Sequence, residues 1–180
     1  NIVIVGGMAN TILKHTGIKV GKSICENNCS SLIKEIIDIS EKFNCKIICP
    51  VDVVVSKNIE GLGINKDIKE INDDEMILDI GPKTISLIQK IVNSSNTVLW
   101  NGPAGYFENP HFQNGTKQIL EIISKKTIND KIFSVAGGGE TVAAINKFKK
   151  LDSFTFVSTA GGAFLEYLEG KTLPGIKAIN

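Results

Sequence analysis

A glycine turn followed by a carboxylate and a hydroxyl, Gly137-Gly138-Gly139-Glu140-Thr141, is the segment of this sequence best suited to chemistry. Backbone N–H groups can converge on an anion where no Cβ intervenes, and the N-terminus of a following helix adds about half a positive charge. A carboxylate would repel the same anion, so Glu140 favours a divalent cation between them. The pattern indicates a metal–nucleotide site, although tight strand-to-helix turns also use glycine for packing.

The basic residues limit how a phosphate can be held, because all 20 of them are Lys and the chain has no Arg. Bidentate guanidinium binding is therefore excluded, which leaves lysines, backbone N–H groups or a metal. The net charge is only +1, and no apolar run reaches the roughly 20 residues of a membrane span. We expect neither nucleic acid nor a membrane among the partners.

Two further polar residues lie where strands are expected to end. Glu108, after Tyr106-Phe107, can accept hydrogen bonds from ribose hydroxyls or be a solvated surface residue. Asn101 directly follows Trp100 and can donate to a phosphate or close a turn. We expect Trp100 to lie in the core. The histidines, His15 and His111, lack a spaced Cys, Ser or Asp partner, and we expect both at the surface.

The cysteines follow a C-x3-C…C-x3-C pattern: Cys25, Cys29, Cys45 and Cys49. Zinc ligands usually have closer spacing, so the pattern favours reduced thiols of a cytosolic protein over a zinc site. Two nucleotide fingerprints are absent from the sequence. Without G-x-x-x-x-G-K-[ST] a P-loop NTPase is disfavoured, and without G-x-G-x-x-G after the first strand so is a dinucleotide-dependent dehydrogenase.

Short apolar runs alternate with amphipathic ones, which predicts βα units, a parallel sheet and a single domain. The expected strands are 2–5, 46–49, 51–55, 76–80, 97–100, 132–136 and 154–158, with an edge strand at 68–71. The expected helices are 6–14, 30–43, 84–92, 110–124 and 164–168.

Glycines follow most of these strands and precede the helices: Gly6-Gly7, Gly81, Gly102, Gly105, Gly137-Gly139 and Gly161-Gly162. The carboxyl ends of parallel strands meet at one edge of a sheet, where ligands bind. The placement predicts a shared surface for close backbone approach to a nucleotide. The alternative is that these turns use glycine only for their own conformation.

Several motifs together resemble phosphoglycerate kinase. Trp100-Asn101-Gly102-Pro103-Ala104-Gly105-Tyr106-Phe107-Glu108 is similar to that family's W-N-G-P-x-G-x-F-E segment, and Gly137–Thr141 to its G-G-G-[DE]-[ST] turn. Other segments match in the family's order: 6–11, 50–52, 78–84, 158–163, 168–171 and 173–175. The resemblance covers the chain from end to end.

The resemblance implies an α/β fold, a three-layer α/β/α sandwich with a mostly parallel, Rossmann-like sheet. It implies reversible phosphoryl transfer between ATP and the carboxylate of 3-phosphoglycerate, in glycolysis and in the cytoplasm, with Mg²⁺ as cofactor. Residues 1–180 would be the C-terminal, nucleotide-binding domain, incomplete at its N-terminal end and without the substrate-binding N-terminal domain. The full-length protein would be a monomer.

The resemblance also assigns roles by motif. Gly6, Gly7 and Gly81 would line the adenine pocket, and Glu108 would bind the ribose hydroxyls. The remaining nucleotide-binding residues would be Asn101, Pro103, Gly137, Gly138, Gly139, Glu140 and Thr141. Glu140 would be the Mg²⁺ ligand, and Gly138, Gly161 and Gly162 would be the catalytic residues facing the transferring group.

Two residues depart from the family pattern. Glu140 stands where Asp is common, and its extra methylene lengthens the reach by about one bond. Ala160 replaces the first Gly of a frequent G-G-G, which would cost on the order of 1 kcal/mol if that position required a positive φ.

The missing part of the family's sequence carries the basic groups for 3-phosphoglycerate and for the nucleotide phosphates. We therefore expect these 180 residues to bind nucleotide weakly, not to turn over, and to leave an edge beside the first strand open to association. The alternatives are a non-catalytic nucleotide-binding or interaction module, and a zinc-dependent structural protein.

Overall fold

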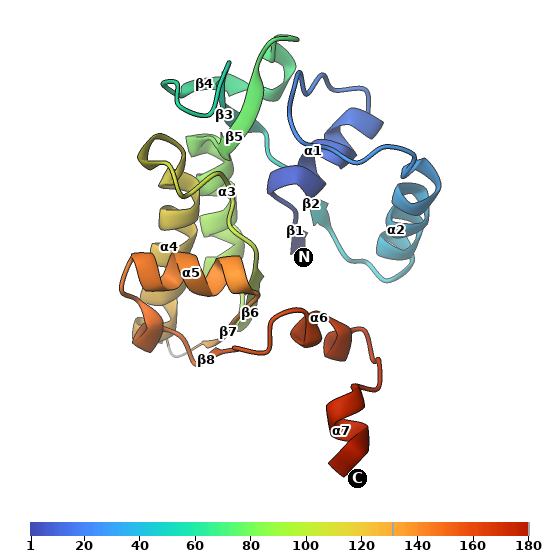
Figure 1. Ribbon diagram of the computed structural model, residues 1–180, viewed down its shortest axis with the longest axis vertical. Helices are drawn as coiled ribbons and strands as arrows, with labels where there is room; N and C mark the ends of the chain where they lie inside the picture. Colours follow the sequence, from blue (N-terminus) through green and yellow to red (C-terminus); the bar gives the residue numbers. More distant parts are fainter. Residues whose placement is uncertain (131, 180) are drawn as a thin grey trace. The chain divides into compact units, whose positions relative to one another are not determined.

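The computed structural model describes residues 1–130 and 132–179, which form two compact units. Unit 1 comprises Asn1–Asn93 and Pro103–Ile119, and unit 2 comprises Ser94–Gly102 and Leu120–Asn180. Strands and helices are interspersed along the chain and alternate from β5 to α6 (Figure 1), which confirms the α/β class. Whether the two units are one domain, as we expected, stays a prediction.

The elements have the following bounds. The strands are β1 (Ile2–Val3), β2 (Ile47–Ile48), β3 (Asp52–Ser56), β4 (Ile64–Asp67), β5 (Met76–Ile80), β6 (Thr97–Asn101), β7 (Phe133–Gly137) and β8 (Phe156–Val157). The helices are α1 (Gly6–His15), α2 (Ser30–Lys42), α3 (Pro82–Asn93), α4 (Asn114–Asp130), α5 (Gly139–Lys147), α6 (Gly162–Leu168) and α7 (Pro174–Ile179), with 3-10 turns η1 (Ile68–Glu70), η2 (Pro110–Phe112) and η3 (Leu151–Ser153).

The described strands pair in three sheets. In unit 1, β1 and β2 are parallel, whereas β4-β3-β5 is antiparallel throughout. In unit 2, β6-β7-β8 is parallel. The prediction of parallel pairing therefore fails for β3 and its neighbours. A short connection joins β3 to β4 as an antiparallel hairpin, and β5 also runs antiparallel to β3 on its other side.

Several elements differ from the prediction: β1 and β8 are shorter than the strands expected at 2–5 and 154–158, and α7 was not expected. The edge strand expected at 68–71 is wrong: the strand is Ile64–Asp67, and the Asp67 carboxylate then accepts from Lys69 N at 3.2 Å to begin η1. The helix expected at 110–124 is a 3-10 turn followed by α4, which continues to Asp130. Asn109 begins that turn by accepting from His111 N at 2.8 Å, and Gln113 lies between the turn and α4.

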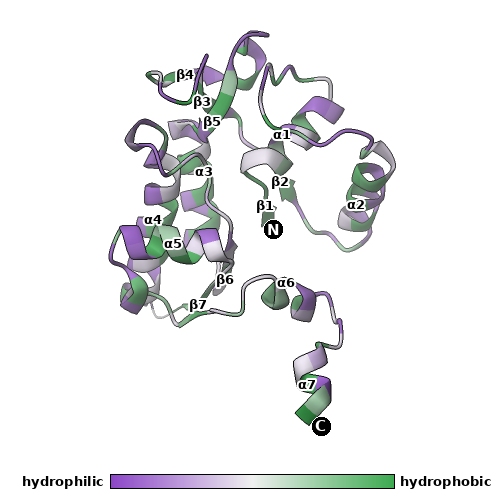
Figure 2. Cartoon of the chain, in the orientation of Figure 1, coloured by the Kyte–Doolittle hydropathy of each residue, from purple (hydrophilic) through white to green (hydrophobic). Residues whose placement is uncertain are grey.

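Each unit has its own apolar interior. In unit 1, Val53 and Val55 of β3 are fully buried and pack with Ile71. In unit 2, Trp100 is buried and stacks on Phe154 with ring centroids 6.1 Å apart, which confirms its predicted core position. Hydrophobic and hydrophilic residues share the same helices, α2 and α4 for example, as expected of amphipathic helices (Figure 2). Among the residues described, no helix is both long and apolar enough to span a bilayer.

Candidate functional site

The glycine turn after β7 lies at the carboxyl end of the parallel sheet of unit 2. The register pairs Asn101, the last residue of β6, with Gly137, the last residue of β7. Gly138 has φ +89°, and a Cβ there would lie 2.6 Å from Asn101 Oδ1. A Cβ on Gly137 would overlap the ring of Phe164. These two glycines are thus required by backbone conformation and packing, and the structure brings Asn101 to the turn.

Thr141 connects this turn to the end of β6. Its side chain is fully buried, and its hydroxyl accepts from Gly102 N at 2.6 Å. Gly102 O in turn accepts from Trp100 Nε1 at 2.8 Å. One lone pair of the Thr141 hydroxyl is therefore used within the protein, and what the group can still offer a phosphate is its hydrogen.

The first turn of α5 is open. Gly139 has no positive φ, and a Cβ there would meet nothing within 4 Å. Gly138, at the N-cap, supplies no side-chain hydrogen bond, and the exposed Glu140 is the acidic residue of this turn. Helix N–H groups uncapped by a side chain attract anions, and a carboxylate is an oxygen ligand of the kind Mg²⁺ takes. The residues present fit a Mg²⁺-bound phosphate.

A second open turn follows β8. Gly161 has φ +58° and precedes α6, and a Cβ on Gly161 or Gly162 would meet nothing within 4 Å. Ala160 does not have a positive φ, so the strain considered for its replacement of glycine does not arise. Its N–H donates to the buried Ser158 hydroxyl at 3.3 Å.

In unit 1, three predicted nucleotide residues lie around the start of α1. Gly6 has φ +62°, and a Cβ there would lie 3.9 Å from Pro103 O. A Cβ on Gly7 would lie 3.7 Å from the Ile24 side chain. Val5, at the N-cap of α1, gives no side-chain hydrogen bond. Gly6, Gly7 and Pro103 are thus brought together beside an uncapped helix start.

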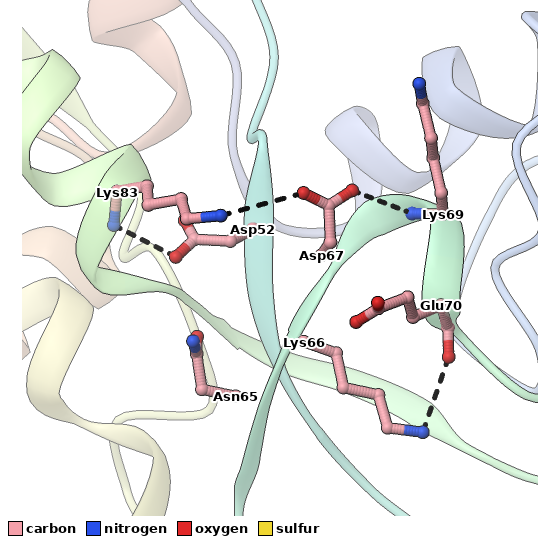
Figure 3. A pocket seen from close by; sticks show the side chains of 7 residues that line it. All are labelled: Asp52, Asn65, Lys66, Asp67, Lys69, Glu70 and Lys83. Carbon is pink, nitrogen blue, oxygen red and sulfur yellow. Dashed lines mark hydrogen bonds and ion pairs between the residues drawn. The ribbon is translucent and has the colours of Figure 1, made fainter.

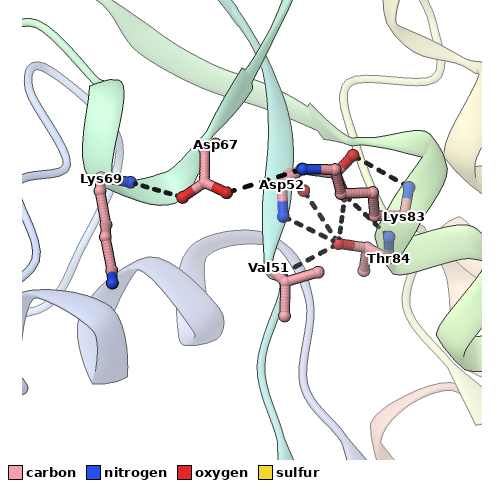
Figure 4. A network of polar contacts seen from close by, with 6 residues as sticks. All are labelled: Val51, Asp52, Asp67, Lys69, Lys83 and Thr84. Atoms are coloured by element: carbon pink, nitrogen blue, oxygen red, sulfur yellow. Dashed lines mark hydrogen bonds and ion pairs between the residues drawn. The ribbon is translucent and has the colours of Figure 1, made fainter.

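Gly81 is in a different situation, because it is buried against Asp52. A Cβ on Gly81 would overlap the Asp52 carboxylate, which is 1% exposed. That carboxylate caps α3: Oδ2 accepts from Lys83 N at 2.9 Å, and Oδ1 accepts from the N–H and the hydroxyl of Thr84 at 2.7 Å each (Figure 4). Packing alone accounts for glycine at position 81, whatever else it contacts.

A polar hollow of about 490 Å³ lies beside this network, and none of the predicted site residues lines it (Figure 3). Its lining residues are Asp52, Asn65, Lys66, Asp67, Lys69, Glu70 and Lys83. Lys66 is paired with the buried Glu75 at 2.8 Å, and Lys83 Nζ lies 3.8 Å from Asp67. The lining as a whole carries three lysines and three carboxylates, so the hollow does not offer a strongly basic site for an anion.

Glu108 is exposed and lines a separate cleft of about 430 Å³ in unit 1. The cleft is lined by Ile59, Glu60, Tyr106, Glu108, Asn109, Pro110 and His111. A carboxylate beside an aromatic ring on an open cleft can receive a sugar hydroxyl. His111 and His15 are exposed, as predicted.

Asp79 is a buried polar residue that the sequence reasoning did not single out. It is 1% exposed, and its two oxygens accept from Gly115 N at 2.7 Å and Ile80 N at 2.9 Å. Burial raises the pKa of Asp79 to about 7, against the lowering effect of those two N–H groups. The available signal was a lone acidic residue within the otherwise apolar strand Met76–Ile80.

The four cysteines are unpaired and half-buried. Among residues 1–130 and 132–179, no three His, Cys, Asp or Glu side chains come together as a metal-binding group. The zinc alternative therefore has no ligand set in the part of the chain that the structure describes.

Comparison with known proteins identifies relatives over nearly the whole chain. Residues 1–171 match the family model described as phosphoglycerate kinase. The phosphoglycerate kinase of Xanthobacter autotrophicus is 46% identical over 180 residues, covering 99% of this chain and 46% of that protein. The phosphoglycerate kinase structure from Coxiella burnetii matches with a TM-score of 0.90 at 40% identity, covering 97% of this chain and 44% of that one.

A more distant structure, the Pyrococcus horikoshii phosphoglycerate kinase, matches with a TM-score of 0.75 at 28% identity over 98% of this chain and 44% of that one. These likenesses are consistent with the three-layer α/β/α fold implied by the motifs. The chain spans about half the length of the relatives it matches. The family match over residues 1–171, with the motifs placed as described, shows that the chain belongs to the phosphoglycerate kinase family.

Proposed function

We propose that this chain is the nucleotide-binding part of a phosphoglycerate kinase, which transfers a phosphoryl group reversibly between ATP and the carboxylate of 3-phosphoglycerate. The products in the ATP-consuming direction are ADP and 1,3-bisphosphoglycerate, and the reaction belongs to glycolysis. The observation that carries the proposal is the open start of α5, where Gly139 leaves space and Glu140 supplies a carboxylate. Phosphoryl transfer depends on this kind of positioning and charge neutralisation rather than on covalent chemistry by the protein.

The unit 2 residues would hold the phosphates. Backbone N–H groups of Gly137, Gly138 and Gly139 and the amide of Asn101 would donate to phosphate oxygens, with the Thr141 hydroxyl as a further donor. Glu140 would hold Mg²⁺, which neutralises charge on the phosphates when bound.

Gly161 and Gly162 would approach the transferring group by their backbone, because no side chain stands over them. Gly138 would act with them as the third residue on that group. The absence of Arg makes backbone donors and the metal more important here.

The unit 1 residues would bind the rest of the nucleotide. Gly6, Gly7 and Pro103 surround the start of α1, where their backbone can lie against the base, and Gly81 would contribute its backbone to the adenine pocket. Glu108 would accept hydrogen bonds from the ribose hydroxyls in its cleft.

Binding of 3-phosphoglycerate would rest on residues outside this chain, which spans about half of its relatives. We therefore propose that residues 1–180 alone bind MgADP weakly and do not turn over. The full-length protein would act as a monomer in the cytoplasm.

Calorimetric titration of MgADP into the chain and its variants tests the proposal. We expect Glu140→Ala to lower affinity about tenfold in the presence of Mg²⁺ and much less without it, since one charge-assisted contact is lost. Glu108→Ala should lower affinity in both conditions. Glu35→Ala, which removes an exposed carboxylate on α2, is the matched control and should have no effect. Equal affinities for all four proteins would contradict the site assignment.

A further inference from the structure

The segment that carries Glu108, residues 103–108, is hydrogen-bonded to two other elements of unit 1, β5 and the first turn of α4. Tyr106 N donates to Leu78 O at 2.8 Å, so the segment is tied to β5. Ala104 N donates to the fully buried hydroxyl of Thr116 at 3.0 Å, so it is also tied to the first turn of α4. The residues Pro103–Glu108 therefore depend on both elements for their position.

Asp79 lies where the 103–108 segment, β5 and α4 meet. One carboxylate oxygen accepts from Gly115 N at 2.7 Å, which ties β5 to the first turn of α4. Glycine is required on both sides of the carboxylate: a Cβ on Gly105 would lie 2.6 Å from Asp79 Oδ1, and a Cβ on Gly115 would overlap the same oxygen. The carboxylate is thus packed between the Glu108 segment and α4 with no room for a side chain on either.

Glu108 itself stands between two fixed residues. Tyr106 is held to β5, and on the other side Asn109 Nδ2 donates to Ile59 O at 2.7 Å. Glu108 is exposed and lines the 430 Å³ cleft from the short segment between these two residues. A shift of this segment would move the Glu108 carboxylate. Its hydrogen bonds to the sugar hydroxyls would then weaken steeply, because hydrogen bonds depend on geometry.

We infer that Asp79 is a positioning residue for nucleotide binding: it holds the Pro103–Glu108 segment between β5 and α4 and so sets where Glu108 meets the sugar hydroxyls. This inference rests on the proposed function, since it takes Glu108 as the ribose ligand. Asp79 would touch neither the nucleotide nor the reacting atoms. Its effect passes through Gly105 and Gly115.

The test compares ADP with 2′,3′-dideoxy-ADP, which lacks the hydroxyls that Glu108 would bind, using the variant Asp79→Asn. Asn keeps one acceptor oxygen and replaces the other by an amide donor, so one of the two backbone N–H groups loses its acceptor. We expect the wild-type chain to prefer ADP about tenfold, as for one charge-assisted hydrogen bond, and Asp79→Asn to lose most of that preference. The double variant Asp79→Asn/Glu108→Gln should lose no more of the preference for ADP than Glu108→Gln alone.

Two further variants separate positioning from general stability. Thr116→Val removes the acceptor for Ala104 N by another route and should reduce the same preference, whether or not Asp79→Asn folds well. Asp52→Asn alters an equally buried carboxylate whose bonds go to α3 instead. It should lower the melting temperature while leaving the ratio of the two affinities unchanged.

Amide hydrogen exchange without nucleotide gives a readout independent of the proposed function. Exchange at Tyr106 and Gly115 should accelerate in Asp79→Asn, but not at Lys83 or Thr84. If Asp79→Asn leaves exchange at Tyr106 and Gly115 unchanged, the inference is overturned but the proposed function is not. The same holds if exchange is faster while the preference for ADP over 2′,3′-dideoxy-ADP is unchanged. A wild-type chain that binds both analogues equally would instead overturn the ribose role of Glu108, and the inference with it.

Discussion

Three glycines of unit 1 and three of unit 2 differ in what surrounds them, although Gly137 of unit 2 is crowded and Gly17 of unit 1 is open. In unit 1, Gly81, Gly105 and Gly115 are crowded, since a Cβ on any of them would run into Asp52 or Asp79. In unit 2, a Cβ on Gly139, Gly161 or Gly162 would meet nothing within 4 Å. The same residue type therefore serves two purposes in similar strand-to-helix connections.

The comparison separates glycines required by the fold from glycines available to a ligand. At Gly81, Gly105 and Gly115 the missing Cβ lets a buried carboxylate approach the backbone, so replacing these glycines should lower stability. Gly139 and Gly162 are required neither by neighbours nor by a positive φ. Glycine at these two positions would let a phosphate approach the backbone closely, which agrees with the proposed binding site at the start of α5.

The largest expected effect concerns the carboxylate between Gly105 and Gly115. Burial raises the pKa of Asp79 to about 7, above its unfolded value, so the folded chain binds more protons between about pH 4 and 7. The neutral carboxyl's contribution to stability is fully present below about pH 4 and is lost as the pH rises through 7, by about 4 kcal/mol in total.

Urea unfolding of the chain between pH 5 and 8.5 checks this expectation. The unfolding midpoint should fall as the pH rises, and Asp79→Asn should remove most of that fall. The lowered pKa values of Glu75 and Asp74 act in the opposite direction, with stability lost at lower pH as each group protonates through its folded pKa. A midpoint that falls equally in Asp79→Asn would contradict the assignment to this carboxyl.

Gly81→Ala is expected to destabilise the chain by about 3 kcal/mol, because the new Cβ would displace the Asp52 carboxylate from the start of α3. The free energy of unfolding from urea titration measures the loss. A change below about 0.5 kcal/mol, typical of a surface position, would show that the crowding at Gly81 is readily relieved.

The open turn before α6 allows a matched pair. Gly161→Ala should cost about 1 kcal/mol, because φ is +58° there, whereas Gly162→Ala should not destabilise the chain, since Gly162 has neither a positive φ nor a close neighbour. Thermal melts of the two variants compare them directly. Equal losses would mean that something other than backbone conformation sets the cost.

The smallest expected effect on stability is a gain. Gly139→Ala should stabilise α5 by about 0.5 kcal/mol, since Ala has the higher helix propensity and meets no neighbour. Its affinity for MgADP should nevertheless fall, because the methyl group would stand where the phosphate approaches. A variant that is more stable and binds MgADP unchanged would remove Gly139 from the proposed site.

The sequence predicted the alternation of strands and helices and most of their positions, because apolar periodicity and glycine placement are local signals. It did not predict the antiparallel pairing of β3, since pairing depends on contacts distant in sequence. Ile64–Asp67 carries too few β-forming residues to be recognised as a strand.

The motifs singled out the open turns of the candidate site, but they could not distinguish open glycines from crowded ones. Gly81 and Gly139 look alike in sequence, and only the three-dimensional packing shows Asp52 against one and free space beside the other. The buried carboxylates Asp52 and Asp79 were missed for the same reason. Their partners, Thr84 and Gly115, lie 32 and 36 residues away along the chain.

The response of the backbone amides to MgADP, followed by ¹⁵N NMR of the labelled chain, tests the proposed phosphate site at the start of α5 most directly. We expect large shifts at Gly139 and Glu140 that depend on Mg²⁺, with little change at the crowded Gly115. Shifts that leave residues 138–141 unmoved while MgADP binds elsewhere would contradict the proposed site.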